Sequence, residues 1–207
     1  MRLPIRLDYA RFLQDQDRAI DALRCLHEAI QENPQSSEAW LLGGQIALSR
    51  PQMLEFACDW TGEAVRHRPE DSALLAQRAE ALLLSNALPQ ASAAWERLAA
   101  ANPQPPTLAA QIVCDLVTGR ESRPLPDSGV AAATGRAFLG WYRKCIEFNA
   151  QEIVLALNQR VEALKRVLPE AGQILEMALS EATESPEVAA GVAGDIKNVS
   201  APLAVTE

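Results

Sequence analysis

Residues 37–69 of the chain read SEAWLLGGQIALSRPQMLEFACDWTGEAVRHRP. This stretch ends at Pro69, which lies 35 residues after Pro34 and 34 residues before Pro103. Similar sequence precedes all three prolines, so the chain contains an internal period. A period of this length is typical of stacked helix pairs, each of which buries its apolar face against its neighbours. The sequence therefore predicts an all-α array of helical repeats.

Small residues recur at fixed places within each period. In the first expected helix of each unit they are Ala10, Gly44 and Ala79. In the second helix they are Ala22, Ala57 and Ala91 at one position, and Ala29 and Ala64 at a later one. The second period needs a one-residue insertion near Pro51 to keep this register. Two helices approach closely only where no large side chain separates them, so these positions predict the contacts between helices.

The chain resembles the tetratricopeptide repeat (TPR) family over residues 3–104. The family pattern places an aromatic residue, small residues and a final proline at set distances. The second and third periods match it at Trp40, Gly44, Ala57, Ala64 and Pro69, and at Ala79, Ala91, Trp95 and Pro103. Gly43 stands where the family has Leu, and Thr61 stands at an aromatic position. The resemblance implies a right-handed superhelix built from units 3–35, 36–70 and 71–104.

The remainder of the chain departs from this pattern. Residues 105–118 predict one extra helix without a second helix to pair with, and residues 119–130 form a Gly/Pro/Ser-rich linker. Residues 131–183 predict a C-terminal helical region, divided at Asn149 by a capping box with Glu152. This region is either a degenerate repeat ending at Pro169 or a helical hairpin that caps the stack. Residues 184–207 are expected to be disordered, because they contain few large apolar side chains.

Composition limits the class of function. The net charge of −8 disfavours binding to nucleic acid or to an anionic membrane, because both need clustered Lys and Arg. No apolar run is long enough to span a bilayer, and the N-terminus has no apolar signal core. The four cysteines are widely spaced, which favours free thiols in a reducing compartment. We therefore expect a cytoplasmic protein.

Residues suited to catalysis or metal binding are few. His27 and His67 belong to different repeats, and neither has a nucleophile or an acid nearby in a recognisable pattern. Asp15, Asp17 and Asp21 lack the Gly turn and the further oxygen ligands of a calcium loop. The sequence predicts no enzyme site, no metal site and no cofactor.

The resemblance implies a groove lined by the first helix of each unit, which in this family takes an extended peptide or a helix. The residues at the matching positions are Leu7, Arg11, Gln14, Glu38, Leu41, Gln45, Leu48, Ala73, Ala76, Glu80 and Leu83. Only Arg11 is basic among them, so a clamp for a C-terminal carboxylate is disfavoured. An alternative occupant is the chain's own segment 131–168, which carries more basic than acidic residues.

Three functions are consistent with these features. The first is a protein–protein interaction scaffold that binds a partner protein or peptide in the groove. The second is an accessory domain of a larger bacterial enzyme such as a glycosyltransferase, because the repeats begin almost at Met1 without a solubilising cap. The third is self-association, in which the exposed first helix stacks on a second copy.

Overall fold

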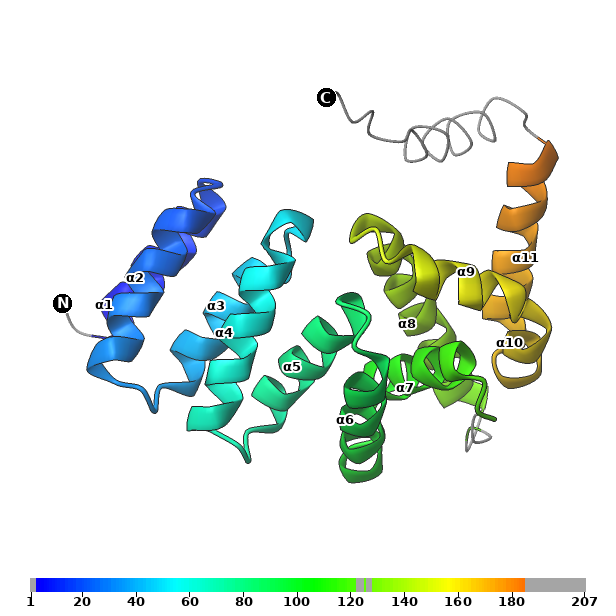
Figure 1. Ribbon diagram of the computed structural model, residues 1–207, viewed down its shortest axis with the longest axis horizontal. Coiled ribbons are helices and arrows are strands. Elements are labelled where there is room, and N and C mark those ends of the chain that lie inside the picture. The colour runs from blue at the N-terminus through cyan, green and yellow to red at the C-terminus, as the bar shows by residue number, and fades with distance from the viewer. Residues whose placement is uncertain (1–2, 122–124, 126–127, 185–207) are drawn as a thin grey trace, which may run out of the picture.

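The computed structural model describes residues 3–121, 125 and 128–184. All the regular structure in these residues is helical, and Figure 1 shows the helices following one another along an arc. The elements in chain order are α1 (Leu3–Asp15), α2 (Ala19–Glu32), α3 (Ser37–Ala47), the 3-10 turn η1 (Pro51–Met53), α4 (Leu54–His67), α5 (Ser72–Leu84), α6 (Leu88–Ala101), α7 (Pro105–Thr118), α8 (Ser128–Glu147), α9 (Gln151–Gln159), α10 (Val161–Val167) and α11 (Pro169–Glu184).

The first six helices form three pairs, and each pair packs on the next. α1 packs on α2, α3 on α4 and α5 on α6, while α2 packs on α3 and α4 on α5. The small residues of the repeat are buried at these contacts: Ala10, Ala22, Ala29, Gly44, Ala57, Ala64, Ala79 and Ala91. The predicted all-α helical repeat fold is confirmed.

The turns inside the helix pairs explain the insertion near Pro51. In the first and third pairs, Asp17 and Asn86 adopt the left-handed conformation, with φ of 56° and 61°. Asp and Asn tolerate this conformation better than most residues. The equivalent place in the second pair holds Pro51, whose fixed φ forbids it. There the chain makes the turn η1 instead, with one additional residue.

The three repeat prolines each follow the end of a second helix. Asn33, Arg68 and Asn102 close these helices with φ between −137° and −147°. A residue before proline is excluded from the helical region, so each helix ends there. The next helix then starts from a side-chain cap in two cases. Ser36 accepts the backbone N–H of Ala39, and Asp71 accepts those of Ala73 and Leu74.

Trp60 accounts for the glycine that replaces leucine at position 43. A Cβ atom at Gly43 would fall inside the indole ring of Trp60, which lies against α3. Trp60 Nε1 donates to the carbonyl oxygen of Trp40 at 2.9 Å, and the two indole rings meet edge to face at 5.0 Å. The indole from α4 therefore fills the space that a leucine on α3 fills in the family pattern.

The C-terminal region differs from the sequence prediction in its pairing. α7, the helix expected to lack a partner, packs against α6 on one side and α8 on the other. α8 begins at Ser128, three residues before the expected boundary, so helix replaces the end of the expected linker. Sequence spacing missed this pair because the segment that connects the two helices is much longer than the turns inside the other pairs.

The predicted capping box at Asn149 is not formed. Asn149 adopts the left-handed conformation with φ of 54°, and Ala150 stands at the N-cap of α9 without a side-chain hydrogen bond. The expected second helix is also interrupted at Arg160, which separates α9 from α10. Leu168 closes α10 with φ of −133°, as the residues before the three repeat prolines do, and Pro169 begins α11.

Two further sequence predictions concern thiols and membranes. All four cysteines are free; Cys114 and Cys145 are buried, while Cys25 and Cys58 are half-buried. None of the helices described has both the length and the apolar character needed to cross a bilayer. The expected disordered tail lies outside the described residues, apart from Glu184 at the end of α11.

Candidate peptide-binding groove

The predicted groove residues fall into three groups by exposure. Leu7, Leu48 and Leu83 are buried and belong to the hydrophobic core, so their side chains are not available to a ligand. The half-buried positions are Gln14, Leu41, Ala76 and Glu80, and the exposed positions are Arg11, Glu38, Gln45 and Ala73. The accessible groove positions are therefore mostly polar, with Leu41, Ala73 and Ala76 as their apolar members.

One position of the first helices shows where this surface is open. Gln45, Glu80 and Cys114 each lie eleven residues after a repeat proline, and Arg11 is their equivalent on α1. Arg11 and Gln45 are exposed, Glu80 is half-buried, and Cys114 is fully buried. This position of the predicted groove is thus exposed on α1 and α3 and buried on α7.

At the open end, charges on α1 and α3 neutralise one another. Arg11 donates from Nη2 to Oε1 of Glu38 at 2.6 Å and from Nη1 to Oδ1 of Asp8 at 3.1 Å. The hydrogen bond that Arg11 donates to Glu38 is the main cause that raises the pKa of Arg11 above its ordinary value. Two carboxylates thus share the one guanidinium of this surface, which does not suit the capture of a free carboxylate from a partner.

A hydrogen bond fixes α5 to α3 beneath the open surface. Gln77 on α5 donates from Nε2 to the carbonyl oxygen of Leu41 at 2.9 Å. Gly44 allows this approach, because a Cβ atom there would collide with the Gln77 amide. Leu41 and Ala76 are therefore held on adjacent helices whose spacing is set by Gly44 and Gln77.

At the covered end, the C-terminal helices reach α5. Lys144 on α8 pairs with Glu80, and both side chains are mostly shielded from solvent. The Lys144 ammonium also lies 5.5 Å from the ring centre of Phe148. Asn86, between α5 and α6, donates to the carboxylate of Glu152 on α9. α8 and α9, which contain much of segment 131–168, both pack on α7, and Cys114 of α7 is buried.

Residues with possible chemistry occupy structural environments. His67 stacks on Trp40 at 5.5 Å, and the ring of His27 is hydrogen-bonded to Gln31. Burial raises the pKa of the Cys114 and Cys145 thiols to about 12, so both are protonated and unreactive at neutral pH. Within the described ranges, no group of three or more His, Cys, Asp or Glu side chains is placed to hold a metal ion.

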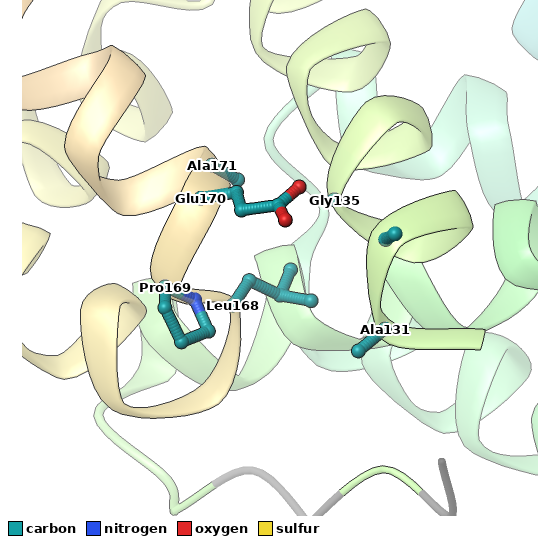
Figure 2. Close-up of a pocket in the computed structure, with 7 residues that line it drawn as sticks. Ala131, Gly135, Leu168, Pro169, Glu170 and Ala171 are labelled. Atoms are coloured by element: carbon teal, nitrogen blue, oxygen red, sulfur yellow. The ribbon is translucent and has the colours of Figure 1, made fainter. Parts of the chain in front are cut away.

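Among the described residues, two of the pockets lie away from the predicted groove positions. One, of about 210 Å³, separates the start of α8 from the start of α11. Figure 2 shows that small side chains and Leu168 line it, and that the Glu170 carboxylate extends across it towards Gly135. Its lining contains one charged group and no other polar side chain, so it offers little chemistry for recognition.

The second pocket, of about 400 Å³, lies between α2 and α4 and is mostly apolar. It is lined by Ile20, Leu23, Arg24, His27, Gln52, Met53, Phe56 and Trp60. Sequence reasoning missed this pocket, because its residues come from two different repeats. The available signal was the placement of Ile20 and Phe56, two large apolar residues at positions that point away from the core of their own helix pair.

The chain was compared with known protein families, curated proteins and solved structures. No family model matches it, and neither does any curated protein. Among solved structures it is similar to YrrB, described as a TPR protein with an unusual peptide-binding site. The two chains share 14% sequence identity with a TM-score of 0.53, and the match covers 85% of this chain and 90% of YrrB. The fold is therefore TPR-like.

Proposed function

We propose that this chain is a non-catalytic protein–protein interaction scaffold. Its groove would bind a peptide or a helix of a partner protein over α1, α3 and the start of α5. The observation that carries the proposal is the gradient of exposure along the groove, from exposed Arg11 and Gln45 to buried Cys114. A ligand can reach the surface only where the chain's own C-terminal helices leave it open.

The chemistry of the open surface indicates what it would bind. Leu41 and Ala76 offer a small apolar strip, while Glu38 and Gln45 offer acceptors and donors beside it. Such a surface suits an amphipathic segment better than a terminal carboxylate, because Arg11 is already paired. The similarity in fold to a TPR protein with a peptide-binding site supports this class of function.

Affinity capture from the source cell, read by mass spectrometry, tests the proposal. Leu41→Glu places a charge on the apolar strip, and Gln45→Arg adds bulk at an exposed position. We expect each to reduce recovery of a specific partner about tenfold, the effect of losing roughly 1.4 kcal/mol of binding free energy. Gln90→Arg on α6 is the matched control, because Gln90 is exposed and lies on a second helix.

Circular dichroism separates loss of binding from loss of folding. Leu41 is half-buried, so a decrease in helicity for Leu41→Glu would identify it as a core position. Gln45 is exposed and its substitution should leave helicity unchanged. Recovery of the same partners by folded Gln45→Arg and by wild type would reject the groove as the binding surface.

A second candidate function, self-association, is favoured by α1. Ile5, Tyr9 and Phe12 are 51%, 44% and 55% exposed and form one stripe along this helix. The equivalent residues of α3, Ala39 and Ile46, are completely buried, and α3 packs on α2 of the preceding pair. In the described residues no helix covers the same face of α1, which makes it the surface on which a second copy would stack.

A further inference from the structure

The α2–α4 pocket is not a general consequence of the repeat. The next gap between second helices, α4 to α6, can be compared with it position by position. Ile20 and Leu23 correspond there to Glu55 and Cys58, and Phe56 and Trp60 correspond to Gln90 and Ala94. The same geometry is therefore lined by large apolar residues in one place and by polar or small residues in the next.

The rim of this pocket exposes apolar surface at an energetic cost. Ile20 is 66% exposed and Phe56 is 42% exposed. Removing a large apolar side chain from water is favourable, so two such residues facing solvent across a pocket favour an occupant that covers them. The volume of about 400 Å³ is within the range typical of ligand sites.

The floor of the pocket is rigid. Trp60 is held by its hydrogen bond to Trp40 and by its packing against Gly43. The ring centre of Phe56 lies 5.6 Å from that of Trp60. Trp40 is fixed in turn, because its Nε1 donates to the carbonyl oxygen of Pro34 at 2.9 Å. A preformed aromatic wall lowers the entropy lost when a ligand binds.

Charge at the pocket favours an acidic group in the occupant. Arg24 and His27 are the ionisable side chains of the lining, which contains no carboxylate. The Arg24 guanidinium is 70% exposed and lies 3.6 Å from Asp21, while Arg18 makes the closer pair with Asp21 at 2.8 Å. Arg24 is thus able to turn towards a bound carboxylate without breaking a close ion pair.

We propose that the α2–α4 pocket is a binding site for a segment of a partner protein in which a large apolar side chain neighbours an Asp or Glu residue. The apolar side chain enters between Ile20 and Phe56 and packs on Trp60. The neighbouring carboxylate pairs with Arg24. This site uses second helices and is separate from the groove on the first helices, so a partner can occupy either surface alone.

Random peptides displayed on phage and selected on the full chain provide a test that needs no known partner. Selected peptides are synthesised with a fluorophore, and their affinities are measured by fluorescence polarisation. We expect a Leu, Phe or Trp beside an Asp or Glu in these peptides. The variant Ile20→Glu with Phe56→Gln carries residues that the chain itself has at Glu55 and Gln90. It should bind the peptides at least tenfold more weakly.

A charge exchange tests the acidic group separately. Arg24→Asp introduces the residue found at the equivalent Asp59. It should weaken the binding of the acidic peptide and strengthen the binding of the same peptide with Lys in place of the acid. Because Arg24 is exposed, this variant keeps the proposal testable even where the double variant fails to fold.

Three results would overturn the proposal. One is selected peptides that bind the folded double variant as tightly as wild type. Another is an affinity that Arg24→Asp leaves unchanged for both the acidic and the Lys peptide. The third is binding that Gln45→Arg abolishes and the double variant does not, which would assign the peptides to the groove instead.

Discussion

Glycine at position 43 and tryptophan at position 60 form a complementary pair across two helices. Gly43 removes the side chain that the family pattern places on α3, and Trp60 on α4 takes that volume. Trp60 also satisfies its indole N–H by donating to Trp40, so the exchange adds no unpaired donor to the core. The same indole forms the floor of the α2–α4 pocket, which couples the packing of this repeat to a candidate binding site.

Gly43→Ala should destabilise the protein by about 1–3 kcal/mol, because the new methyl group would overlap the Trp60 ring in a close-packed core. Gly140→Ala on α8 is the matched control, since nothing lies within 4 Å of a Cβ atom built there. Alanine is the better helix former, so the control should be stabilising by up to about 1 kcal/mol. Urea unfolding measures the change in the free energy of unfolding for both variants. Equal effects on both would contradict the packing argument.

The starts of α3 and α5 are capped by side chains that accept backbone N–H groups. Asp71 caps α5 by accepting from Ala73 and Leu74, and it also accepts a hydrogen bond from the Ser37 hydroxyl on α3. The bond from Ser37 is the main cause that lowers the pKa of Asp71 below its ordinary value of 3.8. One carboxylate therefore fixes the start of α5 and joins two successive repeats.

Asp71→Ala should lower the free energy of unfolding by about 1 kcal/mol at neutral pH, the usual effect of losing an N-cap. The pKa of Asp71 is lower in the folded state, so its charge stabilises the protein above about pH 3.8. That contribution is lost as pH falls through the folded-state pKa. The difference between wild type and Asp71→Ala should thus be constant from neutral pH down to about pH 4 and then shrink.

Denaturant unfolding over this pH range measures the difference. Asp71→Asn is the control, because asparagine caps helices about as well as aspartate but carries no charge. It should retain most of the stability at neutral pH and lose the pH dependence. A wild-type advantage over Asp71→Asn that stays constant below pH 4 would contradict the assignment to the carboxylate.

At the scale of the whole molecule, the array packs C-terminal helices on its third repeat and exposes apolar side chains at its first helix. Lys144 and Glu152 bring the C-terminal helices against the third repeat. Figure 1 shows α1 at one end of the arc and α11 at the other, so these helices cannot cover one another within a single chain. The stripe of Ile5, Tyr9 and Phe12 is then available to a second copy.

We expect weak self-association through this stripe. The average mass from light scattering should rise above the monomer mass of 22.5 kDa as the concentration approaches roughly 1 mM. A contact made mainly by three side chains of one helix is small, so it supports only modest affinity. Phe12→Glu should keep the chain monomeric at every concentration. Gln90→Glu, an equal charge change on α6, should not. A wild-type chain that stays monomeric up to this concentration would exclude the interface.

Some properties of the protein follow from its sequence because they depend on residues close together in the chain. The helical period, the buried small residues and the prolines that end each second helix need only local spacing. The groove residues were predicted less accurately than the helices. Leu7, Leu48 and Leu83 match groove positions but are buried, because the period does not reveal which neighbouring helix covers a side chain.

Other properties are decided by the tertiary structure, because they depend on segments from different repeats. α8 pairs with α7 across a long connection, and Lys144 meets Glu80, 64 residues earlier in the chain. The α2–α4 pocket joins Ile20 of the first repeat to Phe56 and Trp60 of the second. The sequence alone thus determines a TPR-like helical array. The packing of distant segments decides where the predicted groove positions are exposed and where the array has an apolar pocket.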